Sequence, residues 1–155
     1  MMRLSKIFIV IIIVPIFCFS QNKDQLKKWY TNTVEGESKL NSIMTFKFGD
    51  VGYSVKVIEI IENELIKWVC VDADEVFKEV VDHETVFSLE QLNDKTKIRF
   101  SQYGFLEKND LYAGINYSWG KYLESLRQFV QIGTGEGFGS ENYSCLLYTS
   151  DAADE

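Results

Sequence analysis

The residues that could do chemistry in this chain are few and lie far apart in the sequence. His83 is the only histidine, so neither a catalytic triad nor a histidine metal site has a second member. It stands in the acidic string Asp82-His83-Glu84 at the start of an expected strand, where we expect a solvated surface position. Cys70 lies on the inward face of another expected strand with no positive group beside it, so we interpret it as a small core residue. The sequence predicts no catalytic residue, no metal site and no cofactor.

A glycine-rich string occupies residues 133–137 and directly follows a helical pattern. Phosphate-binding loops have the reverse order, because the phosphate is held by amides at the start of a helix. We therefore interpret the string as a helix stop. Carboxylates are plentiful, but none interrupts an apolar run as a paired catalytic acid and base would.

The clearest structural pattern is one long helix in the stretch 112–138, which ends at the glycines. Its charged residues fall on one side, where they can stay in water. Apolar residues recur at helical spacing and form one wide face, which needs a broad apolar surface to lie on. That face consists of Ile115, Trp119, Tyr122, Leu123, Leu126, Phe129 and Val130.

The segments before the long helix predict an antiparallel sheet. Alternating residues joined by short polar turns indicate consecutive antiparallel strands, and hence an α+β fold. The stretch 72–82 fits either a helical turn or an irregular connection, and we favour the irregular connection. The expected order is a short helix at 22–30, strands from 39 to 48, 53 to 61 and 65 to 72, and a hairpin of 84–89 with 96–103.

Bulk composition excludes several classes of protein. The 155 residues are enough for one domain with a real core. A hydrophobic content of 46% argues against a disordered chain. The net charge of -7, with no basic stripe, argues against nucleic acid as a partner. Nothing in the sequence indicates an oligomeric state.

Both ends of the chain call for separate interpretation. Residues 1–20 have a basic start, a short apolar run and small residues before Gln21, which is typical of a bacterial signal peptide. The run is too short and too interrupted to predict a transmembrane span. Alternatively, IFIVIII at 7–13 is a buried first strand of the fold. Residues 145–155 resemble a translated sequencing adapter, which leaves 21–144 as the expected domain.

Four strings follow one another along the chain: LKKWYT at 26–31, YSVKVIEIIENELIKWVC at 53–70, TVFSLEQLNDKTKIRFSQYGF at 85–105 and YSWGKYLESLRQFVQIGTGEGF at 117–138. In this order they resemble one branch of the START-like (SRPBCC, birch-pollen-allergen-like) superfamily, the branch named after the activator of heat-shock-protein-90 ATPase. The resemblance covers about residues 24–138. It implies a helix-grip fold, in which a curved antiparallel sheet grips one C-terminal helix. Family members begin with a strand that here is either degenerate or missing.

The resemblance also implies a space between sheet and helix that holds a lipid, a polyketide or another apolar molecule. Tyr103, Tyr112 and Asn116 are the polar tips expected to orient it. The alternative is that the same residues simply fill the core. The expected lining is Phe46, Tyr53, Trp68, Phe87, Phe100, Tyr103, Tyr112, Asn116 and Trp119.

Three functions follow from the resemblance as expectations. The first is an exported, non-catalytic module that binds an apolar small molecule or lipid. The second is co-regulation of a chaperone ATPase, which is a cytosolic activity and conflicts with export. The third is an enzyme of the cyclase or aromatase type, which would need an acid or base among inward positions that are almost wholly apolar.

Overall fold

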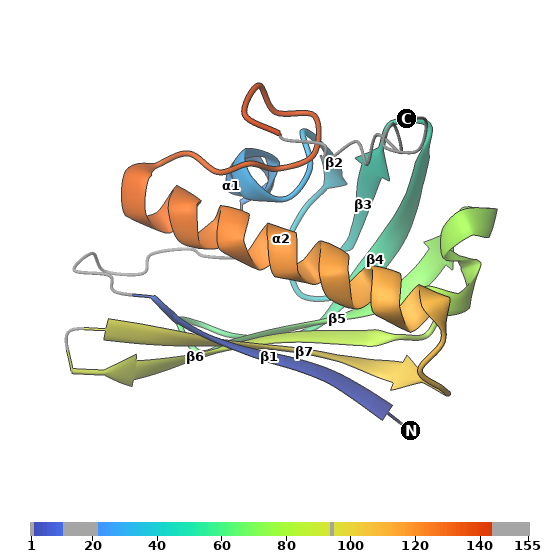
Figure 1. The fold of residues 1–155 in the computed structure, drawn as a ribbon, viewed down its shortest axis with the longest axis horizontal. Coiled ribbons are helices and arrows are strands. Elements are labelled where there is room, and N and C mark those ends of the chain that lie inside the picture. The colour runs from blue at the N-terminus through green and yellow to red at the C-terminus, as the bar shows by residue number, and fades with distance from the viewer. Residues whose placement is uncertain (1, 11–21, 94, 144–155) are drawn as a thin grey trace, which may run out of the picture.

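The computed structural model describes residues 2–10, 22–93 and 95–143. One curved antiparallel sheet wraps around the long helix α2 (Asp110–Ile132), which lies across its inner face (Figure 1). The strand order is β1-β7-β6-β5-β4-β3-β2. The predicted α+β helix-grip architecture is therefore confirmed. The strands are β1 (Met2–Val10), β2 (Thr33–Gly36), β3 (Ile43–Phe48), β4 (Val51–Ile61), β5 (Leu65–Ala73), β6 (Glu84–Leu92) and β7 (Lys95–Phe105).

Two helices are set by clear caps. The short helix α1 (Lys23–Trp29) begins at Asn22, whose side chain accepts a hydrogen bond of 2.8 Å from the amide of Asp24. Helix α2 begins at Asn109, whose side chain accepts from the amide of Tyr112. It ends at Gly133, which has a φ of 83° and so adopts the left-handed conformation that glycine tolerates best. The predicted helix stop is thus confirmed.

The core lies between the sheet and α2 and follows the predicted alternation along the strands. Each fully buried large apolar side chain contributes roughly 1.5–3 kcal/mol to folding. Strand β4 carries two register irregularities against β5, and such bulges bend a strand, which suits a sheet that curls around a helix. The buried side chains include Met44, Phe46, Val55, Val57, Ile66, Trp68, Phe87, Ile98, Phe100, Leu123 and Leu126.

The structure differs from the sequence-based expectation in two segments, a 3₁₀ helix and a short edge strand. Residues Glu75–Val80 form a 3₁₀ helix, η1, so the favoured irregular connection was wrong and the helical turn was right. The Lys78 carbonyl accepts from the Val81 amide as the turn closes. The short edge strand β2 was not expected, because its four residues are too few to show an alternation.

The N-terminal strand β1 pairs antiparallel with β7, from Met2 opposite Phe105 to Val10 opposite Thr96. This places a strand where the alternative interpretation of the N-terminus required one. The predicted cleavage before Gln21 lies outside the described residues and stays a prediction. The predicted adapter-derived segment 145–155 also lies outside them.

Candidate ligand-binding site

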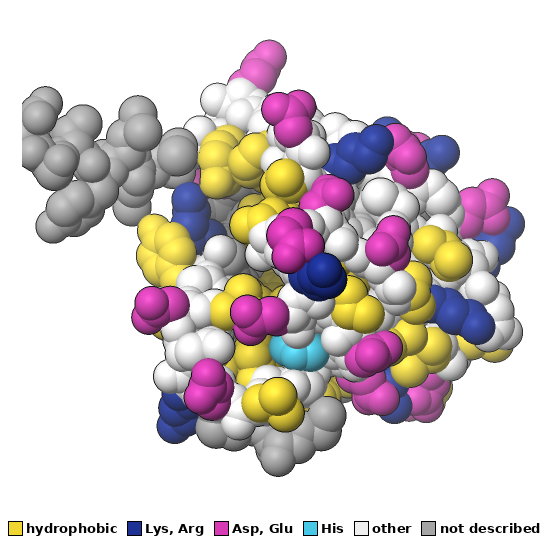
Figure 2. Space-filling model, turned by 90° about the vertical axis from the view of Figure 1, so that its right-hand side faces the viewer, with side chains coloured by type: hydrophobic (Ala, Val, Ile, Leu, Met, Phe, Trp, Pro, Cys, Tyr) yellow, Lys and Arg dark blue, Asp and Glu magenta, His cyan; other side chains and the backbone are white. Residues whose placement is uncertain are grey.

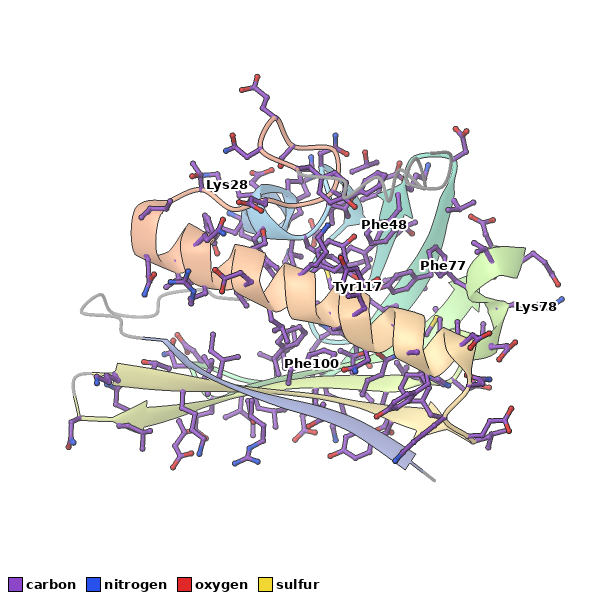
Figure 3. The ribbon with its side chains drawn as sticks, in the orientation of Figure 1. Lys28, Phe48, Phe77, Lys78, Phe100 and Tyr117 are labelled. Carbon is purple, nitrogen blue, oxygen red and sulfur yellow. The ribbon has the colours of Figure 1, made fainter. Side chains whose placement is uncertain are left out.

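A cavity of about 240 Å³ lies between the sheet and the N-terminal half of α2. Two residues that line it are labelled in Figure 3, Phe48 at the end of β3 and Phe77 on η1, and their ring centroids are 6.1 Å apart. No Lys, Arg, Asp or Glu is among the described residues that line it. The lining consists of Tyr30, Phe48, Tyr53, Val55, Cys70, Phe77, Val80, His83, Thr85, Gln102, Ile115, Ser118, Trp119, Tyr122, Phe138 and Tyr143.

Tyr30, Tyr53 and Tyr122 are among the tyrosines that line this cavity. The hydroxyl groups of Tyr30 and Tyr53 are hydrogen-bonded to each other. The ring of Tyr30 also stacks on Trp119, with centroids 5.2 Å apart and planes 7° from parallel. Burial raises the pKa of Tyr30, Tyr53 and Tyr122. All three therefore stay neutral and offer hydroxyl groups that can donate and accept hydrogen bonds.

A second polar group, made of Trp119, Gln102 and His83, lies where α2 meets β7. The indole Nε1 of Trp119 donates to Oε1 of Gln102 at 2.9 Å. Nε2 of Gln102 lies 3.3 Å from Nδ1 of His83. Burial lowers the pKa of His83, while the charges of Asp82 and Glu79 act in the opposite direction. The neutral imidazole is therefore favoured.

His83 is not on the surface, as its acidic neighbours suggested; it is only 7% exposed. Its carbonyl accepts from the Cys70 amide, and the Asp82 amide donates to the Cys70 carbonyl, both at 2.9 Å. These bonds continue the β5–β6 pairing and turn the imidazole inward. The ring packs edge-on against Phe105 and over Gly104, whose φ of 124° and missing side chain leave it room.

Cys70 is buried, in agreement with its interpretation as a small core residue. Burial raises the pKa of its thiol to about 11. Its Sγ lies 3.6 Å from the carbonyl oxygen of Asp72. The thiol is therefore protonated at neutral pH and is a weak nucleophile.

The glycine-rich segment does more than end the helix, because it also leads to Phe138, which lines the cavity. The Phe138 amide donates to the Tyr30 carbonyl at 2.9 Å, and the Asn32 amide donates to the Phe138 carbonyl at 2.9 Å. At Gly137 a Cβ would lie 2.9 Å from the carbonyl carbon of Trp29, so only glycine allows this approach. The ring of Phe138 thereby reaches the cavity wall.

Two of the nine residues predicted to contact a ligand line the cavity, namely Tyr53 and Trp119. Four others lie in the closely packed part of the core, with exposures of 0–2%. For these four the alternative interpretation, that they fill the core, describes their position. Those four are Phe46, Trp68, Phe87 and Phe100.

The three predicted polar tips lie outside the cavity. Tyr103 follows the inward-facing Gln102 on β7, and because successive strand residues face opposite sides, it points to the outer face. Tyr112 packs edge-on against Phe105 near the start of α2. Asn116 lines a shallow groove on the outer side of α2. None of the three is among the residues that line this cavity, and the ligand-binding role of the nine residues stays a prediction.

The polar residues that do line the cavity escaped the sequence analysis, although one left a signal. Ile98 and Phe100 were expected to face inward, so period two also places Gln102 inward. A polar residue at the end of an apolar inward row indicates a buried hydrogen-bond partner. In the sequence, Tyr30 and Tyr122 count only toward the apolar faces of their helices, because periodicity does not show where a hydroxyl points.

The described residues contain no group of three or more His, Cys, Asp or Glu side chains that could hold a metal ion. None of the described helices is long and apolar enough to cross a membrane.

Comparison with known proteins bears on both the fold and the family. A solution structure of the Aha1 dimer from Colwellia psychrerythraea is similar to this chain at 28% identity and a TM-score of 0.76, covering 87% of this chain and 100% of that one. MLL2253 from Mesorhizobium loti is 16% identical, with a TM-score of 0.65 over 80% of this chain and 94% of its own. CalU16 from Micromonospora echinospora is 11% identical, with a TM-score of 0.62 over 90% of this chain and 76% of its own.

The last two likenesses show the fold alone. None of the curated proteins matches the chain. A family model described as "Activator of Hsp90 ATPase homolog 1-like protein" matches residues 16–131, which is more than half of the sequence. The chain therefore belongs to the Activator of Hsp90 ATPase homolog 1-like family.

Proposed function

We propose that this protein binds one small, uncharged and largely apolar molecule in the cavity between the sheet and α2. The observation that carries the proposal is the composition of the lining, which is aromatic and aliphatic with a few neutral polar tips and no charged side chain. Binding pockets for small molecules have this composition. A volume of about 240 Å³ corresponds to roughly eight water molecules. It suits a compact ring system better than a long acyl chain.

Neighbouring positions on α2 allow a matched test. Ser118 lines the cavity, whereas Tyr117 is 57% exposed and lines the outer groove. A Ser118→Trp variant would fill the cavity from its rim, and a Tyr117→Trp variant would add the same ring outside it. The probe is 2-isopropenylnaphthalene, and its affinity is measured by NMR titration. We expect the wild type and Tyr117→Trp to bind it with the same affinity. Ser118→Trp should bind it at least about tenfold more weakly.

Equal binding by both tryptophan variants would place the probe elsewhere and contradict the proposal. The amide shifts locate the probe independently. Amides of β5, β7 and the first turns of α2 should move in the wild type.

We also propose that the protein is exported, with residues 1–20 as a signal peptide. The apolar run with its basic start supports it, and cleavage before Gln21 would remove β1 from the sheet. Mass spectrometry of the protein purified from its own host gives the mature N-terminus. A chain that retains Met2–Val10 in the periplasm or the cytoplasm would contradict cleavage.

The second candidate function is stimulation of a chaperone ATPase. It is supported by the family description and by the 28% identity with the Aha1 structure. A steady-state ATPase assay of the host's heat-shock-protein-90 homologue, with and without this protein, tests it. A rate unchanged at saturating protein would remove this candidate.

A further inference from the structure

The three polar side chains Trp119, Gln102 and His83 form a chain of hydrogen bonds whose direction is fixed at one end. An indole Nε1 can only donate a hydrogen bond. Because it lies 2.9 Å from Oε1 of Gln102, the amide must present its oxygen to Trp119. A flipped amide would place two donors face to face. The NH₂ group of Gln102 therefore points to His83.

This direction determines the tautomer of His83. Nε2 of Gln102 lies 3.3 Å from Nδ1 of His83 and can only donate, so Nδ1 must accept. A neutral imidazole carries one N–H, which is then on Nε2. Protonation of Nδ1 would break the bond to Gln102, and burial already lowers the pKa of His83 against the opposing charges of Asp82 and Glu79.

The Nε2–H group is available to a molecule in the cavity. Within the described residues, Nε2 has no hydrogen-bond partner and is not among the fully buried unpaired side-chain atoms. A small part of the imidazole reaches the surface, where Figure 2 shows it in cyan beside apolar and acidic side chains, with one basic side chain above it. Phe105, with its ring centroid 4.6 Å from that of His83, and Gly104 hold the ring in place.

The charges around this donor restrict what it can bind. No cationic side chain lines the cavity, and the charged groups that act on His83 are the carboxylates of Asp82 and Glu79. An anion would lose its hydration here without gaining a counter-charge. A carbonyl oxygen only accepts, so it matches the Nε2–H donor without requiring a second partner in the lining.

We propose that the molecule bound in this cavity is an uncharged carbonyl compound, a ketone or an ester, whose oxygen accepts a hydrogen bond from Nε2–H of His83. This inference rests on the proposed function and adds the chemical class of the ligand. Trp119 and Gln102 act as positioning residues, because they set the direction of the donor without needing to touch the carbonyl.

The tautomer can be tested without any ligand. Nitrogen-15 NMR of the free protein at neutral pH distinguishes a protonated from an unprotonated ring nitrogen. We expect Nε2 of His83 to be protonated and Nδ1 to be unprotonated. The reverse tautomer would overturn the inference and leave the proposed function untouched.

Three probes of similar shape test the ligand class: 2-acetylnaphthalene, 2-isopropenylnaphthalene and 2-naphthoate. The ketone should bind about tenfold more tightly than the alkene, which leaves the N–H without an acceptor. It should also bind more tightly than the carboxylate. Equal binding of ketone and alkene, or tightest binding of the carboxylate, would overturn the inference. If ketone and alkene bind equally, the proposed function still stands. If none of the three probes binds, the proposed function and this inference are both contradicted.

Variants connect the preference to the donor. His83→Phe should remove the tenfold preference for the ketone over the alkene, because the variant has no N–H to donate to the carbonyl oxygen. Trp119→Phe keeps an aromatic ring but removes the N–H that orients the Gln102 amide. The amide can then flip, so the ratio of the affinities for ketone and alkene should fall. Tyr117→Phe, on the outer side of the same helix, should leave this ratio unchanged. A ketone advantage that persists in both site variants would overturn the inference; a thermal unfolding transition verifies that each variant is folded.

Discussion

The space between the sheet and α2 has a packed region and a hollow region. The packed region consists of Phe46, Trp68, Phe87 and Phe100, with exposures of 0–2% and ring centroids 5.2–5.5 Å apart between neighbours. The hollow region surrounds the cavity and includes the half-buried Phe48 and Phe77. In Figure 3, Phe100 lies below α2, whereas Phe77 lies toward η1. Trp119 belongs to both regions, since its ring contacts Phe100 at 4.3 Å and its N–H begins the hydrogen-bond chain.

The comparison shows that one alternating pattern builds both a dry core and a cavity. The two regions differ in the polar groups beside them. Around the cavity, Tyr30, Tyr53 and Gln102 have side chains that are hydrogen-bonded to one another or to a neighbour, and the space between sheet and helix is not filled. The hollow region is therefore expected to contribute less to stability and more to binding.

The largest expected effect separates the two regions directly. Phe100→Ala should lower the free energy of unfolding by about 3–5 kcal/mol, because it opens a void among rings that cannot collapse. Phe77→Ala removes the same atoms from the cavity lining, where the ring is only partly buried, and should cost less than about 1.5 kcal/mol. Urea unfolding of both variants provides the comparison. Equal losses would mean that the two regions are packed alike.

The second prediction concerns Gly104, whose backbone contacts the imidazole of His83 beside the cavity. Gly104→Ala would place a Cβ 2.2 Å from Cδ2 of His83, at a φ of 124° that alanine disfavours. We expect a loss of about 2–3 kcal/mol, measured by urea unfolding, and a shift of the His83 side-chain resonances. Gly114→Ala is the control, since nothing lies near its Cβ and α2 should gain about 0.5–1 kcal/mol. Similar outcomes for the two variants would contradict a close contact between Gly104 and His83.

The sequence predicted the packed region better than the hollow one. Residues such as Phe87 and Phe100 follow period two in a hairpin, so their inward direction is a local property of the strand. The long helix and its end at Gly133 are local in the same way. The resemblance of four short strings then supplied the arrangement of sheet and helix. The family model later showed the membership that those strings indicated.

The hollow region depends on contacts between segments distant in sequence, which periodicity does not show. His83 was expected in water because its neighbours are acidic, yet backbone bonds to Cys70 on another strand turn it inward. The Tyr30–Tyr53 pair joins α1 to β4. Tyr103 was expected to orient a ligand, but the inward-facing residue on this part of β7 is its neighbour Gln102. A cavity is set by such distant pairs, so its lining was mostly missed.

The third prediction concerns pH and the burial of His83 in the hollow region. Its folded pKa lies below the ordinary value of 6.5, so between these two values the unfolded chain binds more protons than the native protein. The free energy of unfolding should therefore fall as the pH drops through 6.5 and level off below the folded pKa. Urea unfolding of the wild type and His83→Phe between pH 5 and 8 isolates this contribution. Parallel curves for the two proteins would show that His83 is not protected from protonation.

The smallest effect is expected on the solvent side of α2, which belongs to neither region and provides a baseline for both. Nη2 of Arg127 lies 2.5 Å from Oε1 of Glu124, and both side chains are at least one-third exposed. Water and salt weaken such a pair, so Glu124→Gln should lower the free energy of unfolding by only about 0.3–0.5 kcal/mol. The difference should vanish in 1 M sodium chloride, as urea unfolding at both salt concentrations would show. A loss as large as that of Phe77→Ala would mean that this charge pair supports the helix over the cavity, and the hollow region would then extend through α2 to its outer face.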